Sequence, residues 1–209
     1  MTIAQTADEL GALGSATLGE CGALRMDHRI KPAWPGAAVA GPAITARCGK
    51  ADNLAIHVAV ADNIVVGTVL VVDATNPPEL GYWGEVLTTA AQSRDIAGLV
   101  IDGGTRDTAA IEEHGFPVFS ALVALTGASK KKGGTVGQSV TVGGVAVSPG
   151  DWIVGDVDGV VVIPRGSLND VVEAATARYE NEQHLFAELK AGKTTIELLG
   201  LDPSGLDKK

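Results

Sequence analysis

An arginine and an aspartate, Arg106 and Asp107, follow the apolar run 99–101 and the sequence Asp102-Gly103-Gly104-Thr105. A guanidinium binds a carboxylate through two parallel hydrogen bonds, and a carboxylate is a preferred ligand of hard divalent cations. A 2-oxo acid can use both groups. The guanidinium binds its carboxylate, and the aspartate holds a cation that polarises its keto oxygen. The pair is therefore a candidate site for a small 2-oxo acid and a metal ion. On spacing alone, a surface salt bridge or a turn-stabilising pair is favoured over such a site.

The start of a helix is the second feature that could bind a ligand. Tyr82-Trp83-Gly84 precedes Glu85-Val86-Leu87, where a helical pattern of apolar residues begins. The free N–H groups and the positive dipole end of a helix start attract anions, and Gly84 allows a ligand to approach the backbone closely. Glu85 is predicted to lie at the edge of this anion pocket. Its alternative role is that of an acidic first-turn residue that favours the helix dipole.

These features must be positioned by a mixed set of helices and strands. Apolar runs closed by Gly, Pro, Asp and Asn predict strands over residues 39–48, 65–72 and 98–101, the last ending at 102–104, and antiparallel hairpins over 136–164. Helices are predicted over residues 6–18, 84–94, 108–113 and 194–199, over 167–190 with Ser167 as its cap, and from Asp52 or Asn53 to residue 61. Arg106 and Asp107 then lie at the carboxyl end of a strand, where ligands commonly bind in α/β sheets.

Composition excludes several classes of protein. A chain of 209 residues is long enough for one sizeable core, so we expect a single domain over residues 1–209. The net charge of −9 argues against nucleic-acid binding, which depends on basic residues that neutralise phosphates. No apolar run approaches the length of a membrane helix, and Cys21 and Cys48 lack metal-ligand spacing. We expect a cytoplasmic protein with reduced thiols and no nucleic-acid or membrane partner.

Other polar residues are assigned structural roles. The basic run 130–132 is interpreted as a solvated loop, with binding of an anion as the alternative. Asp156 and Asp158 are assigned to a tight turn before Gly159 rather than to a metal site. The histidines share no spacing with another ligand and are interpreted as structural: His28, His57, His114 and His184.

The spacing of Glu85, twenty residues and then Arg106-Asp107 resembles the acid-x20-Arg-Asp signature of the class II pyruvate aldolases. These enzymes cleave 4-hydroxy-4-methyl-2-oxoglutarate and 4-carboxy-4-hydroxy-2-oxoadipate, and their family includes the regulators of ribonuclease E activity. The resemblance covers roughly residues 11–201. Its further blocks are residues 52–57, 84–91, 98–107 and 155–160.

The resemblance implies a role for each site residue. Asp107 ligates Mg²⁺ or Mn²⁺, with water in most other positions, and Arg106 contacts the keto oxygen or carboxylate and stabilises the enolate. The amides of Val86 and Leu87, next to Gly84, hold the pyruvyl carboxylate, and Glu85 anchors metal-bound water. The family acid is often Asp, and the extra methylene of Glu85 is expected to move the water that it holds by about 1 Å, so low activity is expected.

The implied fold is an α/β protein, a layered αββα sandwich with a β-rich core flanked by helices. The implied activity is metal-dependent cleavage of 4-hydroxy-2-oxo acids to pyruvate, with oxaloacetate decarboxylation as a side activity. The alternative is a non-catalytic regulator that binds and inhibits a ribonuclease. A homotrimer or homohexamer is expected, with Glu182 reaching a neighbouring site. The predicted last helix carries more apolar residues than one core needs: Val171, Val172, Ala175, Tyr179, Leu185, Phe186 and Leu189.

Overall fold

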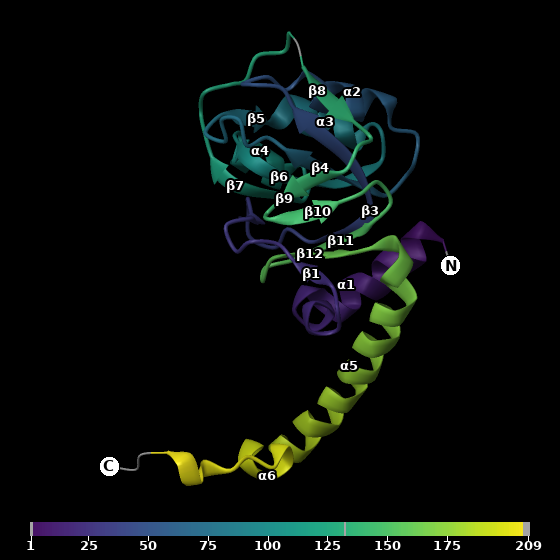
Figure 1. Ribbon diagram of the computed structural model, residues 1–209, viewed down its shortest axis with the longest axis vertical. Helices are drawn as coiled ribbons and strands as arrows, with labels where there is room; N and C mark the ends of the chain where they lie inside the picture. Colours follow the sequence, from purple (N-terminus) through teal and green to yellow (C-terminus); the bar gives the residue numbers. More distant parts are fainter. Residues whose placement is uncertain (1, 132, 207–209) are drawn as a thin grey trace.

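A large twisted sheet forms the centre of the computed structural model, which describes residues 2–131 and 133–206. Within that part of the chain the sheet has ten strands, ordered β1-β12-β11-β3-β4-β6-β7-β2, with β5 paired to β6 and β8 to β3 (Figure 1). Its strands are β1 (Leu24–Arg25), β2 (Lys31–Pro32), β3 (Val39–Cys48), β4 (Thr68–Asp73), β5 (Gly81–Trp83), β6 (Ile96–Thr105), β7 (Val118–Val123), β8 (Gly134–Val136), β11 (Trp152–Gly155) and β12 (Val160–Ile163). A separate hairpin contains β9 (Val140–Val142) and β10 (Val145–Val147).

The strands β3, β4, β6 and β7 are parallel to one another, so each connection must cross the sheet. Three helices belong to these crossovers: α2 (Leu54–Asp62), α3 (Glu85–Gln92) and α4 (Thr108–Glu113). Two further helices, α1 (Ile3–Glu20) and α5 (Leu168–Lys190), lie at the other end of the molecule, and α6 (Thr195–Leu199) follows α5.

Three apolar cores separate four layers. The first core lies between α2, α3 and α4 and one face of the parallel strands. The second lies between the opposite face of those strands and β9 to β12, and the third between β11 and β12 and the helices α1 and α5. Successive side chains of a strand point to opposite faces of the sheet, so one strand contributes to two cores. In β12, Val162 points into the second core and Val161 into the third. The predicted αββα sandwich is confirmed.

The end predicted for the strand over residues 98–101 is wrong, because β6 continues through Gly103 and Gly104 to Thr105. A Cβ atom on Gly103 would lie 2.8 Å from the Cβ of Ala74, and one on Gly104 would lie 2.5 Å from the carbonyl oxygen of Leu80. The two glycines therefore permit close packing inside the sheet rather than a turn. Arg106 and Asp107 still follow the carboxyl end of the strand, as predicted.

Two helix predictions also need correction. Ser167 precedes α5, but its side chain makes no capping hydrogen bond, because a 3₁₀ turn over residues 165–167 leads into the helix. The first helix begins earlier than predicted, at Ile3, and its regular geometry is interrupted at Gly14, where φ is 77°. Of the two caps predicted for α2, Asn53 is the N-cap residue but its side chain makes no capping hydrogen bond, whereas the Asp52 carboxylate accepts one from the Leu54 N–H at 2.9 Å. The predicted hairpins over 136–164 are confirmed.

Beyond its contact with α1, helix α5 extends away from the layered body and carries α6 at its far end (Figure 1). Only Val171 and Ala175 are buried among its residues, whereas Tyr179 and Phe186 are 45% and 46% exposed. The prediction that this helix has surplus apolar surface is confirmed. Among the helices that the structure describes, none combines the length and apolar character needed to cross a membrane.

Candidate functional site

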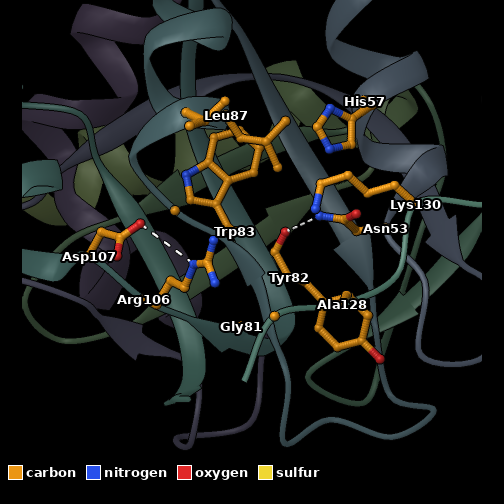
Figure 2. Close-up of a pocket in the computed structure, with 13 residues that line it drawn as sticks. Asn53, His57, Gly81, Tyr82, Trp83, Leu87, Arg106, Asp107, Ala128 and Lys130 are labelled. Atoms are coloured by element: carbon orange, nitrogen blue, oxygen red, sulfur yellow. Dashed lines mark hydrogen bonds and ion pairs between the residues drawn. The ribbon is translucent and has the colours of Figure 1, made fainter. Parts of the chain in front are cut away.

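The structure brings five of the six predicted site residues to one pocket of about 180 Å³ beside the ends of β5 and β6 (Figure 2). The pocket is lined by Gly84, Val86, Leu87, Arg106 and Asp107 together with residues from α2 and from the loop 127–130. Arg106 and Asp107 lie on one side of it, and the residues of α2 and the loop lie on the other. The residues predicted from local spacing therefore converge in space.

Asp107 is held by its own backbone conformation and by the start of α3. Its φ and ψ of 56° and 36° are left-handed, a conformation that Asp adopts more readily than most residues. Its Oδ2 accepts a hydrogen bond from the Glu85 N–H at 3.1 Å and lies 3.6 Å from Arg106 Nε. Arg106 is fixed in turn, because its N–H donates to the Trp83 carbonyl at 3.0 Å. The two side chains are thus oriented by the same strand-to-helix junction.

Glycines make room for this pair. A Cβ atom on Gly84 would lie 2.4 Å from Asp107 Oδ2. A Cβ atom on Gly81 would lie 3.2 Å from Arg106 Cδ and 2.5 Å from the Ala124 carbonyl, and one on Gly127 would lie 3.0 Å from Arg106 Nη1. Sequence reasoning missed Gly81 and Gly127, since a glycine that serves close approach leaves no local pattern when its φ is ordinary.

The start of α3 presents backbone donors to the pocket. Val86 and Leu87 stand in the first turn, where a helix provides no acceptor for their N–H groups. The Leu87 side chain is buried, whereas that of Val86 is 78% exposed. Glu85 is not among the described residues that line the pocket, and its Oε1 lies 3.5 Å from His114 Nε2. Its role in holding metal-bound water stays a prediction.

The donor set fits a hydrated Mg²⁺ better than a metal enclosed by protein. Within residues 2–131 and 133–206, no group of three or more His, Cys, Asp or Glu side chains could hold a metal ion. Asp107 provides a single carboxylate that is 42% exposed, and Mg²⁺ usually retains several waters around one or two carboxylates. Asp156 is used otherwise: its oxygens accept from the Ser15 N–H and hydroxyl and from the Asp158 N–H, which confirms the turn assignment.

Comparison with known proteins decides the family. Residues 4–162 match the family model described as RraA-like, Aldolase/RraA. The chain belongs to the RraA-like family. A relative from Halalkalibacterium halodurans, provisionally named 4-hydroxy-4-methyl-2-oxoglutarate aldolase, is 36% identical over 163 residues, which cover 78% of this chain and 77% of the relative. The resemblance inferred from the spacing of Glu85, Arg106 and Asp107 is confirmed at the level of the family.

Solved structures support the same RraA-like assignment. The chain is similar to Streptomyces coelicolor RraAS2, described as an unusual member of the RNase ES inhibitor RraA protein family, with a TM-score of 0.72, 27% identity and coverage of 90% and 96%. It is also similar to the RNA-processing inhibitor RraA from Thermus thermophilis, with a TM-score of 0.61, 28% identity and coverage of 68% and 85%. The relatives therefore carry names of two different functional classes.

This RraA-like pocket has a polar wall that the sequence did not predict. Asn53 at the N-cap of α2, His57 within α2 and Lys130 of the loop between β7 and β8 line the pocket opposite Arg106 (Figure 2). Lys130 is exposed in its loop, and lining the pocket does not test the interpretation of His57 as structural or of the run 130–132 as a solvated loop, so both stay predictions. The signals in the sequence were that Asn53 and His57 lie in one block, residues 52–57, of the family resemblance, and that binding of an anion was the alternative for the basic run 130–132.

Proposed function

We propose that this RraA-like protein is a divalent-metal-dependent lyase that cleaves 4-hydroxy-2-oxo acids to pyruvate. The substrates proposed are 4-hydroxy-4-methyl-2-oxoglutarate and 4-carboxy-4-hydroxy-2-oxoadipate, with oxaloacetate decarboxylation at the same site. One observation carries the proposal: Arg106 and Asp107 are fixed side by side in a pocket that also exposes the first-turn amides of α3. The name of the Halalkalibacterium halodurans relative supports the same reaction class.

The residues can each perform a distinct part of the reaction. The Val86 and Leu87 amides bind the pyruvyl carboxylate, because a helix start favours an anion. Asp107 would hold Mg²⁺ or Mn²⁺, which when bound supplies positive charge to polarise the keto oxygen. When a base removes the C4 hydroxyl proton, the C3–C4 bond breaks and leaves a pyruvate enolate. Arg106 stabilises its negative charge, a type of contribution worth about 10²–10³ in rate for one donor.

Pyruvate release from oxaloacetate tests the proposal. Decarboxylation of oxaloacetate leaves the same enolate, so the purified protein is expected to release pyruvate when Mg²⁺ is present. Removal of divalent cations with EDTA is expected to lower the enzymatic rate to the uncatalysed background, and added Mg²⁺ to restore it. The measurement is the initial rate of pyruvate formation, with heat-denatured protein as the control. Metal-independent release or no release above background would contradict the proposal.

A non-catalytic regulator is the second candidate. The descriptions of the Streptomyces coelicolor and Thermus thermophilis structures as RNase or RNA-processing inhibitors favour it. Such a protein would bind and inhibit a ribonuclease without turning over an oxo acid. The pyruvate measurement separates the two candidates, because a regulator without chemistry gives no metal-dependent release.

Assembly into a homotrimer or homohexamer is part of the proposal. The exposed Tyr179 and Phe186 on the projecting part of α5 supply apolar surface for a second copy. Glu182 lies between them in the sequence and forms an ion pair with Arg178 Nε at 3.0 Å within the same chain. Its role in a neighbouring site stays a prediction.

Light scattering of the full chain is expected to give three or six times the monomer mass. The Tyr179→Ser and Phe186→Ser double variant is expected to shift the mass downward, and a monomeric wild type would refute the assembly.

A further inference from the structure

Glu85, the residue expected to hold metal-bound water, has a side-chain partner outside the pocket. Its Oε1 lies 3.5 Å from His114 Nε2, which is within ion-pair distance. The Glu85 side chain is 55% exposed, and Glu85 is not among the described residues that line the pocket. An exposed glutamate has a long, flexible side chain, so its carboxylate stays in one place only when a neighbour restrains it.

The backbone of Glu85 is fixed independently of its carboxylate. Glu85 is the first residue of α3, and its N–H donates to Asp107 Oδ2 at 3.1 Å. One residue therefore contacts the proposed metal ligand through its main chain and His114 through its side chain. The direction of the Glu85 side chain is what remains variable, and the contact with His114 is the ion pair that restrains it.

His114 is itself held between two helices. It directly follows α4, where its N–H donates to the Ala110 carbonyl at 2.9 Å. Its own carbonyl accepts from Gln92 Nε2 of α3, also at 2.9 Å. The His114 side chain is 30% exposed, so it is more enclosed than that of Glu85. The imidazole is therefore the better fixed member of the pair and can set the position of the carboxylate.

We propose that His114 is a positioning residue for Glu85. Its Nε2–H holds the carboxylate at the edge of the pocket, where the carboxylate can accept a hydrogen bond from water next to the cation. The inference rests on the proposed function and adds a residue of α4 to its site. The contact matters because a group misplaced by about 1 Å in an oriented site can cost much of the rate. His114 limits the extra freedom that the longer side chain of a glutamate brings to this position.

A double-mutant cycle on pyruvate release tests this role. We expect His114→Ala to lower kcat by about fivefold, the upper range for an exposed ion pair, with little change in KM. In the Glu85→Ala background the same substitution is expected to leave kcat unchanged, because no carboxylate remains to be positioned. His114→Gln, which retains a side-chain N–H donor, is expected to recover part of the loss. His28→Ala is the matched control and is expected to equal the wild type, because the His28 side chain is 93% exposed and does not line the pocket.

The imidazole NMR signals of His114 measure the contact without turnover. In metal-free protein these signals, assigned by their loss in His114→Ala, are expected to shift in Glu85→Ala. They are expected to stay in place in Glu79→Ala, which removes an exposed acid from the loop before β5. A purely structural histidine would lower kcat equally in both backgrounds of the cycle.

Three results overturn the inference and leave the proposed function in place. They are an equal loss of kcat in both backgrounds, an unchanged kcat in His114→Ala, and His114 signals that do not respond to Glu85→Ala. A wild-type protein that releases no pyruvate overturns both the inference and the proposed function.

Discussion

Replacing Arg106 by alanine is expected to lower kcat/KM for pyruvate-forming cleavage by about 10³-fold, within the range found when one donor to a developing oxyanion is removed. The Arg106 side chain packs against Gly81, Gly84 and Gly127, none of which carries a side chain that could replace it. Arg106→Lys is expected to recover little activity, because an ammonium is a point charge without the planar fork of a guanidinium. Initial rates of pyruvate release measure the effect.

The control for this prediction is an arginine outside the pocket. Arg94 is exposed in the turn after α3, and Arg94→Ala is expected to leave kcat/KM within about twofold of the wild type, since isolated surface substitutions have small effects. Arg106 is itself 42% exposed at its side chain, so its removal is not expected to unfold the protein. An Arg106→Ala protein that retains more than a tenth of the activity would exclude Arg106 from the site.

The features that the sequence predicted well are local ones. The strand Val39–Cys48 and the helix Thr108–Glu113 have the predicted bounds, because alternation and helix-start signals lie within each segment. The short strands β5 and β8 were missed, since two or three residues carry no period. Their assignment depends on pairing with distant partners, such as that of Gly134–Val136 with β3.

The same distinction applies to the site. Arg106 and Asp107 are adjacent in sequence, and the helix start that faces them follows from capping and spacing, so this side of the pocket was predictable. The opposite side of the pocket was not predictable, because Lys130 is far from Asn53 in the sequence. Hydrogen bonds between residues 51–53 and 129–131 bring the two residues together. The sequence predicted that Gly84 lets a ligand approach the backbone. In the structure, a side chain at this position would overlap Asp107 Oδ2 whether or not a ligand approaches.

Replacing Asp107 by asparagine is expected to abolish metal-dependent turnover, with a loss of at least about 10³-fold in kcat/KM, because the amide removes the charge that would hold the cation. Asparagine tolerates the left-handed backbone at this position, where φ is 56°, and its Oδ1 can still accept from the Glu85 N–H. The substitution therefore changes the charge while retaining the shape. Calorimetric titration with Mg²⁺ and initial rates of pyruvate release measure the two effects.

The thermal midpoint is the control that separates lost chemistry from lost structure. Asp107 is half exposed and its charge is not buried, so Asp107→Asn is expected to shift the midpoint by no more than about 2 °C, an effect below 1 kcal/mol for a chain of this size. Asp158→Asn provides a matched substitution, because Asp158 is an exposed turn residue outside this pocket. Unchanged turnover and Mg²⁺ binding in Asp107→Asn would place the metal elsewhere, since no other carboxylate among the described residues lines this pocket.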